Sequence, residues 1–151
     1  MRLAIESVDT EIVVVHDAAR PLAAPALIDA VVRQLRASAD AEGVISATAI
    51  TDTVKRASES PDPTADAPSV LETIDRRWLW AAQTPQAFRT RVLRAAQERA
   101  YRKGTLAAAT DEAMLLESVG ARVEIHPASA ENIKITTSED LAEAEEILGG
   151  R

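Results

Sequence analysis

Hydrophobic and polar residues follow two different periods along this chain of 151 residues. Residues 11–15, Glu-Ile-Val-Val-Val, form a run rich in β-branched side chains that predicts a strand buried on both faces. From Pro25 the apolar positions follow a helical period: Ile28, Val31, Val32 and Leu35. Residues 43–48 predict a second strand. Strand, helix and strand in this order predict a βαβ crossover, and therefore an α/β fold with a mostly parallel sheet and flanking helices.

Residues 51–76 do not continue this alternation of strands and helices. Residues 52–56 and 69–74 each alternate polar and apolar side chains, which predicts two short strands. The segment between them, residues 57–68, holds three prolines and three acidic residues and predicts a mobile loop. We therefore expect one domain over residues 1–151, with a two-stranded arm at about 51–76. An isolated hairpin is marginally stable in water, so the arm is expected to pack on a second subunit.

The rest of the chain returns to alternating helices and strands. The pattern predicts helices over 89–101 and 110–119, strands over 122–126 and 132–136, and a last helix that opens with a capping-box-like start at residues 137–140. Thr110 is the expected N-cap of the second of these helices, and Gly120 lies just past its end. Residues 83–88, Gln-Thr-Pro-Gln-Ala-Phe, are interpreted as a polar turn with no role in the core.

Composition excludes several classes of protein. The 24 acidic and 17 basic residues give a net charge of −7, and aromatic residues make up 3%, so neither a phosphate-backbone binder nor a base-stacking surface is expected. No stretch has the ~20 apolar residues of a membrane span. Residues 1–10 lack the apolar core of a signal peptide. The absence of cysteine excludes disulfides and thiolate zinc sites, and we expect a cytoplasmic protein.

Candidate chemistry gathers just after the predicted strands. Asp17 and Arg20 follow the first strand, where ligands of open α/β sheets bind. This pair can hold a hydroxyl and a phosphate, or it can be a structural salt bridge. His16 is interpreted as a tucked-in structural histidine. Lys134 interrupts an apolar strand, so it either faces solvent or points into a site that holds negative charge.

The arm carries a third group of polar residues: Thr53, Lys55 and Arg76. Exposed strands often carry such residues to prevent edge-to-edge pairing, so a structural role and a binding role both stay open. The common catalytic motifs HExxH, GxSxG, GxxxxGK[ST] and GxGxxG are missing. The residues alone therefore predict an α/β domain with an anion pocket.

Six motifs occur in one order along the chain: Val14-Val-His-Asp-Ala-Ala-Arg-Pro21, Thr51-Asp-Thr-Val-Lys-Arg56, Thr73-Ile-Asp-Arg76, Gln83-Thr-Pro-Gln-Ala-Phe88, Thr110-Asp-Glu-Ala113 and Asn132-Ile-Lys-Ile-Thr136. Together they resemble the 2-C-methyl-D-erythritol 4-phosphate cytidylyltransferases of the non-mevalonate isoprenoid pathway. The resemblance covers residues 11–148 and implies a Rossmann-like nucleotidyltransferase domain with a protruding arm. It also implies a homodimer whose arms interlock.

The resemblance implies a reaction as well. A cytidylyl group passes from CTP to methylerythritol phosphate, and 4-diphosphocytidyl-2-C-methyl-D-erythritol and pyrophosphate are formed. The phosphate oxygen of the substrate is the nucleophile, so no Ser, Cys or His nucleophile is required. The reaction uses Mg²⁺, or another divalent cation, held mainly by the CTP phosphates, and no protein metal ligand is expected.

Matched residue by residue, the family pattern implies roles for five side chains. Arg76 and Lys134 match the pair that positions methylerythritol phosphate for attack on the α-phosphate. Asp17 matches the residue that binds substrate hydroxyls, and Arg20 and Thr53 match further pocket residues. Thr53 and Arg76 lie on the arm, so by resemblance they act across the dimer interface.

The chain departs from the family at its beginning. Family members start with a strand and a glycine-rich loop that holds the CTP triphosphate, and nothing here matches that part, so the CTP-binding residues are unknown. We expect an N-terminally truncated domain, with marginal stability from exposed sheet surface. Met1 is then an internal or misassigned start, which we favour, or the start of a truncated product.

Three other functions stay open beside the methylerythritol phosphate cytidylyltransferase hypothesis. One is a ribitol 5-phosphate cytidylyltransferase, against which Ala19 speaks because that sister family tends to carry a bulkier residue there. Another is a non-catalytic remnant that dimerises and binds sugar phosphate. A third is the cytidylyltransferase half of a bifunctional protein.

Overall fold

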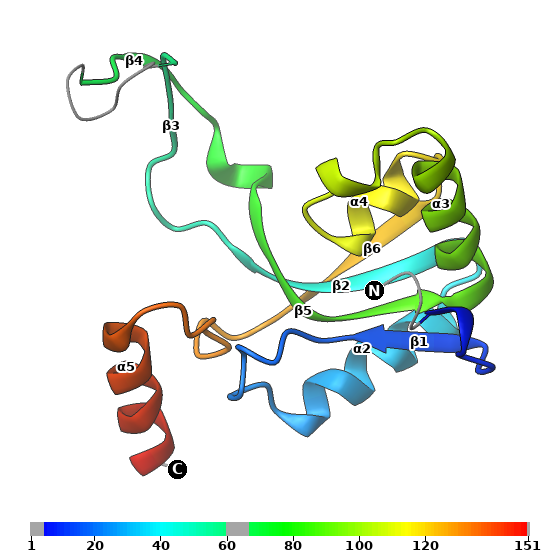
Figure 1. The fold of residues 1–151 in the computed structure, drawn as a ribbon. Helices are drawn as coiled ribbons and strands as arrows, with labels where there is room; N and C mark the ends of the chain where they lie inside the picture. The colour runs from blue at the N-terminus through cyan, green and yellow to red at the C-terminus, as the bar shows by residue number, and fades with distance from the viewer. Residues whose placement is uncertain (1–4, 60–66, 151) are drawn as a thin grey trace. The chain divides into compact units, whose positions relative to one another are not determined.

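The computed structural model describes residues 5–59 and 67–150 (Figure 1). The chain divides into two compact units. One is the arm unit, Ala49–Ala81, and the other is the main unit, which holds the described residues before and after it. Whether the two form one domain stays a prediction.

The main unit is built on a sheet of four strands in the order β1-β5-β2-β6. The strands are β1 (Ile12–Val15), β5 (Trp80–Arg89), β2 (Ala41–Ala49) and β6 (Arg122–Pro127). β5 is antiparallel to β1, whereas β6 is parallel to β2. The predicted α/β class with flanking helices is confirmed. The sheet is mixed instead of mostly parallel, because β5 lies between the two strands of the expected crossover and is antiparallel to β1.

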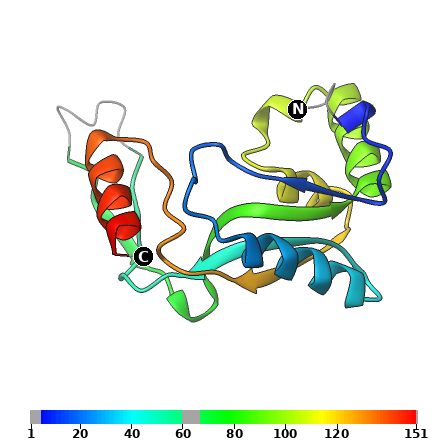
Figure 2. The same ribbon diagram turned by 90° about the horizontal axis from the view of Figure 1, so that it is seen from below.

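Helices cover both faces of this sheet (Figures 1 and 2). α2 (Pro25–Ala37) packs on one face, and α3 (Thr90–Arg102) and α4 (Glu112–Glu117) pack on the other. Successive residues of one strand point to opposite faces, so Ala87 belongs to the core under α2 and Phe88 to the core under α3 and α4. Each core lies within the main unit.

Three helices form where the sequence predicts them. α2 starts at Pro25, and Val31 and Leu35 are completely buried. α3 begins one residue later than predicted. α5 (Ser138–Gly149) opens with a capping box, in which Thr137 accepts a hydrogen bond from the Asp140 amide and donates its own amide hydrogen to the Asp140 carboxylate. None of the described helices has the length and apolar character needed to cross a bilayer.

Four expectations need correction. β1 is half-buried instead of buried on both faces, because it lies at one end of the sheet. The N-cap of α4 is Asp111 and not Thr110, because the Asp111 carboxylate accepts the Met114 amide at 2.9 Å. Residues 132–136 form an extended loop instead of a strand. Residues 83–88 are not a turn but the buried half of β5.

The arm unit contains the two strands predicted for it. β3 (Lys55–Ala57) pairs antiparallel with β4 (Val70–Thr73), and a single 3-10 turn, η1 (Arg76–Trp78), follows. Across the ladder, the Arg56 guanidinium lies 2.7 Å from the Glu72 carboxylate. Residues 60–66 of the predicted mobile loop lie outside the described residues.

Candidate functional site

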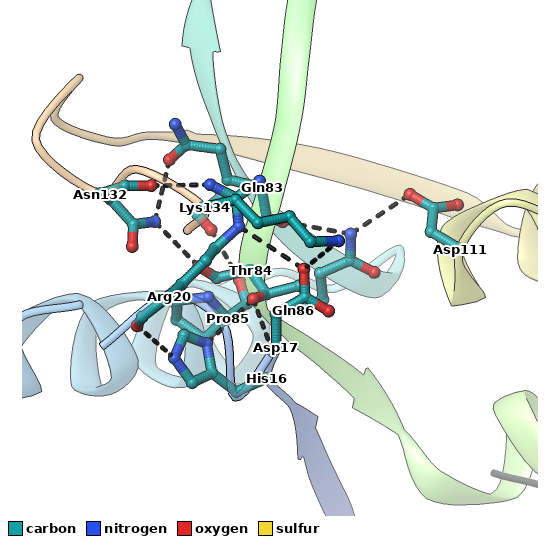
Figure 3. Close-up of polar contacts among 11 residues, drawn as sticks. His16, Asp17, Arg20, Gln83, Thr84, Pro85, Gln86, Asp111, Asn132 and Lys134 are labelled. Carbon is teal, nitrogen blue, oxygen red and sulfur yellow. Dashed lines mark hydrogen bonds and ion pairs between the residues drawn. The ribbon is translucent and has the colours of Figure 1, made fainter. Parts of the chain in front are cut away.

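A pocket of about 350 Å³ opens in the main unit where β1 ends (Figure 3). The loop after β1 contributes His16, Asp17 and Arg20 to its lining. The buried half of β5, the start of α4 and Lys134 complete it. The pocket thus lies where the sequence predicts a ligand site, next to the end of the first strand.

Asp17 lies between two cations in this pocket. Its Oδ2 is 3.2 Å from Lys134 Nζ and 3.6 Å from Arg20 Nε. The Lys134 side chain is 48% exposed and that of Arg20 only 12%, so Lys134 is the more accessible of the two. Burial lowers the pKa of the Arg20 guanidinium, and the charge of Asp17 works against that shift. The structure therefore brings together three of the five residues matched to the family.

Arg20 is fixed by the loop that carries Lys134. Arg20 Nη1 donates to the Asn132 carbonyl oxygen at 2.7 Å. The buried Asn132 amide in turn donates to Gln83 Oε1 and to the Thr84 carbonyl oxygen, both at 2.9 Å. The extended loop that replaces the predicted strand is therefore anchored on β5, and this anchoring places Lys134 at the pocket.

The loop after β1 is anchored on β5 as well. The Asp17 amide donates to Thr84 Oγ1 at 2.9 Å, and His16 Nδ1 lies 3.0 Å from the same hydroxyl. His16 Nε2 lies 3.1 Å from the Arg20 carbonyl oxygen. His16 is exposed, so its interpretation as tucked-in is wrong, yet both of its ring nitrogens have partners.

Carboxylates at the start of α4 form another part of the lining. The Gln86 amide donates to Asp111 Oδ2 and to the Gln83 carbonyl oxygen, both at 3.2 Å. Burial raises the pKa of the neighbouring Glu112, and the charges of Asp111 and Asp17 add to the shift. The pocket therefore offers ammonium and guanidinium groups that suit a phosphate, and carboxylates that suit hydroxyl donors.

Three β5 residues of this site were not predicted from the sequence: Gln83, Thr84 and Gln86. They are buried polar side chains, and their partners come from the loop after β1, from α4 and from residue 132. The only signal for a buried strand was a weak one, the lack of a turn-forming glycine in residues 83–88, and Pro85 argued against a central strand.

The other two matched residues, Thr53 and Arg76, lie in the arm unit. The Arg76 guanidinium donates to the carbonyl oxygen of Thr51 within that unit. The roles expected for both residues stay predictions. Among residues 5–59 and 67–150, no three His, Asp or Glu side chains gather as ligands for a metal ion.

Comparison with known proteins agrees with this architecture. The family model for 2-C-methyl-D-erythritol 4-phosphate cytidylyltransferase (IspD) matches residues 2–150. The enzyme of that name from Pelotomaculum thermopropionicum is 46% identical over 143 residues, which are 95% of this chain and 55% of the relative. A bifunctional IspD/IspF enzyme from Anaeromyxobacter dehalogenans is 43% identical over 150 residues, which are 98% of this chain and 36% of that protein.

Solved structures give the same result. The cytidylyltransferase structure from Francisella tularensis superimposes with a TM-score of 0.81 at 33% identity, over 96% of this chain and 64% of that one. The fold and the relatives define the class as an α/β nucleotidyltransferase. Within that class, the chain belongs to the 2-C-methyl-D-erythritol 4-phosphate cytidylyltransferase family of the non-mevalonate isoprenoid pathway. It spans about half the length of the single-function relatives and about a third of the bifunctional ones.

Proposed function

We propose that this chain supplies the sugar-phosphate side of a site that transfers a cytidylyl group from CTP to 2-C-methyl-D-erythritol 4-phosphate. The observation that carries the proposal is the position of Asp17 between Lys134 and Arg20 in a pocket at the end of β1. In the proposed reaction a phosphate oxygen of the sugar attacks the α-phosphorus of CTP. The new P–O bond forms as the bond between the α-phosphorus and the bridging oxygen breaks, and pyrophosphate leaves.

Each pocket residue has a part in this proposal. Lys134 pairs with the sugar phosphate and reduces its repulsion from the triphosphate, and Asp17 accepts hydrogen bonds from the sugar hydroxyls. Arg20 donates to the Asn132 carbonyl oxygen and forms an ion pair with Asp17, which favours the position of that carboxylate at the pocket. Positioning and charge neutralisation account for most of the catalysis of such transfers.

The proposed reaction needs a divalent cation. We assign Mg²⁺ to the nucleotide phosphates, which is its usual mode of binding to phosphate substrates. When bound there, the ion offsets negative charge on the triphosphate.

The arm belongs to the same proposal. We propose a homodimer in which the arm of one copy brings Thr53 and Arg76 to the pocket of the other. The exposure of β4 supports a subunit contact: every residue of this strand is exposed, and its apolar residues Val70 and Leu71 keep 62% and 59% of their surface accessible. Family membership and the lack of cysteine support a cytoplasmic location.

The test combines binding and turnover with the purified chain. Calorimetry measures the affinity for methylerythritol phosphate, with ribitol 5-phosphate as the competing ligand. Pyrophosphate release is then measured with CTP and Mg²⁺, beside a full-length member of the family. Turnover establishes the enzyme. Binding without turnover shows a substrate site that needs further polypeptide, a preference for ribitol 5-phosphate supports the sister activity, and absence of binding refutes the proposal.

A further inference from the structure

His16 contacts the site through both of its ring nitrogens (Figure 3). A carbonyl oxygen only accepts hydrogen bonds, so the contact of Nε2 with the Arg20 carbonyl, at 3.1 Å, places the ring proton on Nε2. In the neutral ring Nδ1 is then an acceptor, and the Thr84 hydroxyl at 3.0 Å donates to it.

The Thr84 hydroxyl also receives a hydrogen bond from the Asp17 amide, at 2.9 Å. A directed relay results, from the Asp17 amide to the Thr84 hydroxyl and on to Nδ1 of His16. The opposite edge of the same ring donates to the Arg20 carbonyl. Both ends of the relay therefore lie on the four-residue turn that the Arg20 amide closes on the Asp17 carbonyl oxygen at 3.0 Å.

This turn carries the two charged residues of the loop. Its anchor, Thr84, is also the residue whose carbonyl accepts from Asn132, the residue that holds the Lys134 loop. One position on β5 thus fixes both segments that bring charge to the pocket. His16 is a second link between the turn and Thr84, beside the direct hydrogen bond from the Asp17 amide.

We infer that His16 is a positioning residue, which in its neutral form with the proton on Nε2 holds the Asp17–Arg20 turn in the geometry that the sugar phosphate requires. The identity of that ligand rests on the proposed function. The contact of His16 with the turn does not depend on the proposed function, because it follows from hydrogen bonds within the chain.

The second histidine of the chain offers an internal reference. His126 Nδ1 lies 2.8 Å from Gln34 Oε1. The Gln34 amide nitrogen faces the Glu124 carboxylate and the Ile125 carbonyl oxygen, both acceptors, so its oxygen faces His126 and Nδ1 must carry a proton. The two histidines therefore have opposite tautomers when both are neutral.

Long-range ¹H–¹⁵N NMR spectra of the whole chain test this assignment directly. In the pH range where both rings are neutral, His16 is expected as the Nε2–H tautomer and His126 as the Nδ1–H tautomer. A proton on Nδ1 of neutral His16 would overturn the inference, because the relay would then run in no consistent direction.

Substitutions test the positioning role. His16→Gln can keep the donor to the Arg20 carbonyl, His16→Asn can keep the acceptor for Thr84, and His16→Ala keeps neither. The Asp17 amide is expected to exchange its hydrogen faster in the alanine variant. The Kd for methylerythritol phosphate is expected to rise about tenfold with alanine and less with Gln or Asn, consistent with the loss of two hydrogen bonds or one. His126→Ala is the matched control and keeps the wild-type Kd.

The outcomes separate this inference from the proposed function. Wild-type exchange at Asp17 in His16→Ala overturns the positioning role, whether or not any ligand binds. A wild-type Kd in that variant overturns it too. Failure of the wild-type chain to bind methylerythritol phosphate refutes the proposed function, and the tautomers and the exchange of Asp17 still decide the role of His16. Thermal unfolding of each variant shows that the fold is retained.

Discussion

Asp17 has two cationic neighbours that differ in how firmly they are held. Arg20 is nearly buried, and its guanidinium also donates to the Asn132 carbonyl oxygen. Lys134 is half exposed, and an ion pair at such a site contributes roughly 0–1 kcal/mol. Lys134 can therefore turn from Asp17 to a ligand phosphate at low cost, whereas Arg20 keeps Asp17 in place.

This difference predicts the effect of Lys134→Met. Loss of a charged hydrogen bond to phosphate is expected to weaken methylerythritol phosphate binding by about tenfold to a hundredfold. The melting temperature should change little, because the pair is exposed. Calorimetry measures the affinity of the wild type and of Lys134→Met for methylerythritol phosphate. Lys103→Met, a substitution at an exposed lysine after α3, is the control. Equal affinities for the wild type and Lys134→Met would refute the assignment of Lys134.

Asp140 provides a second prediction for a single residue. Its carboxylate accepts hydrogen bonds from the Thr136 hydroxyl and amide at 2.7 and 2.8 Å and from the Thr137 amide at 2.9 Å. These bonds, the Thr136 hydroxyl foremost, lower the pKa of Asp140 from 3.8 to about 2. The folded state thus binds this proton less readily than the unfolded chain. The stabilisation is complete above the unfolded pKa and is lost as the pH falls toward 2.

Asp140→Asn should therefore lower the melting temperature at pH 7, and the difference from wild type should shrink between about pH 5 and pH 2. Thermal unfolding at a series of pH values checks this, with the exposed Glu143→Gln on the same helix as the control. A difference that stays constant down to pH 2 would show that the carboxylate charge does not stabilise the start of α5.

At the scale of the elements, local signals decided which segments could be predicted from sequence. The proline at the start of α2 and the capping box at Thr137 are signals made of a few neighbouring residues, and both helices begin where these signals predict. β5 could not be predicted in this way. A proline inside a run argues against a central strand, and the buried Gln83 is tolerated only because Asn132, 49 residues away, donates to it.

The residues of the site likewise fall into two groups, those that could be predicted from the sequence and those that could not. Asp17, Arg20 and Lys134 were found from their positions next to apolar runs and from the family pattern, and the structure brings them together. Thr84 and Asn132 were not found, because they hold the charged residues through contacts that only the folded sheet creates. The alternation around Lys134 predicted a strand. Instead, the backbone of this segment bonds to the loop after β1, and the Asn132 side chain bonds to β5.

Packing between β2 and β5 predicts the effect of a substitution at Gly43. A Cβ at this position would lie 2.7 Å from Phe88 Cδ1 and 3.3 Å from Leu116 Cδ2, and both side chains are completely buried. Gly43→Ala is therefore expected to destabilise the fold by about 1–3 kcal/mol through overpacking. Urea unfolding measures this. Gly149→Ala, where nothing lies within 4 Å of the added Cβ, serves as the matched control, and equal stabilities for the two variants would contradict the close packing.

At the scale of the whole molecule, apolar surface is distributed unevenly between the two units. Both hydrophobic cores lie in the main unit, on the two faces of its sheet. The arm unit exposes Val70, Leu71 and Trp78, the last with 81% of its surface accessible. A two-stranded ladder of this length is marginal in water without packing against a further surface. The proposed homodimer supplies that surface and gives the arm residues a pocket to act on.

The proposed homodimer predicts that negative charge on the arm prevents dimerisation without unfolding the main unit. In a Val70→Asp, Leu71→Asp variant, burial of two carboxylates in an apolar contact would oppose association, so light scattering should show monomers at concentrations where the wild type is dimeric. The melting temperature of the main unit should stay near that of the wild type, since its cores contain neither residue.

Ser69→Asp adds a charge next to β4 without removing an apolar side chain and serves as the control. A monomeric wild type would refute the homodimer, and a variant that remains dimeric would move the interface away from β4. If the variant is monomeric and also binds methylerythritol phosphate more weakly, the pocket receives part of its affinity from the second copy, as the roles proposed for Thr53 and Arg76 require.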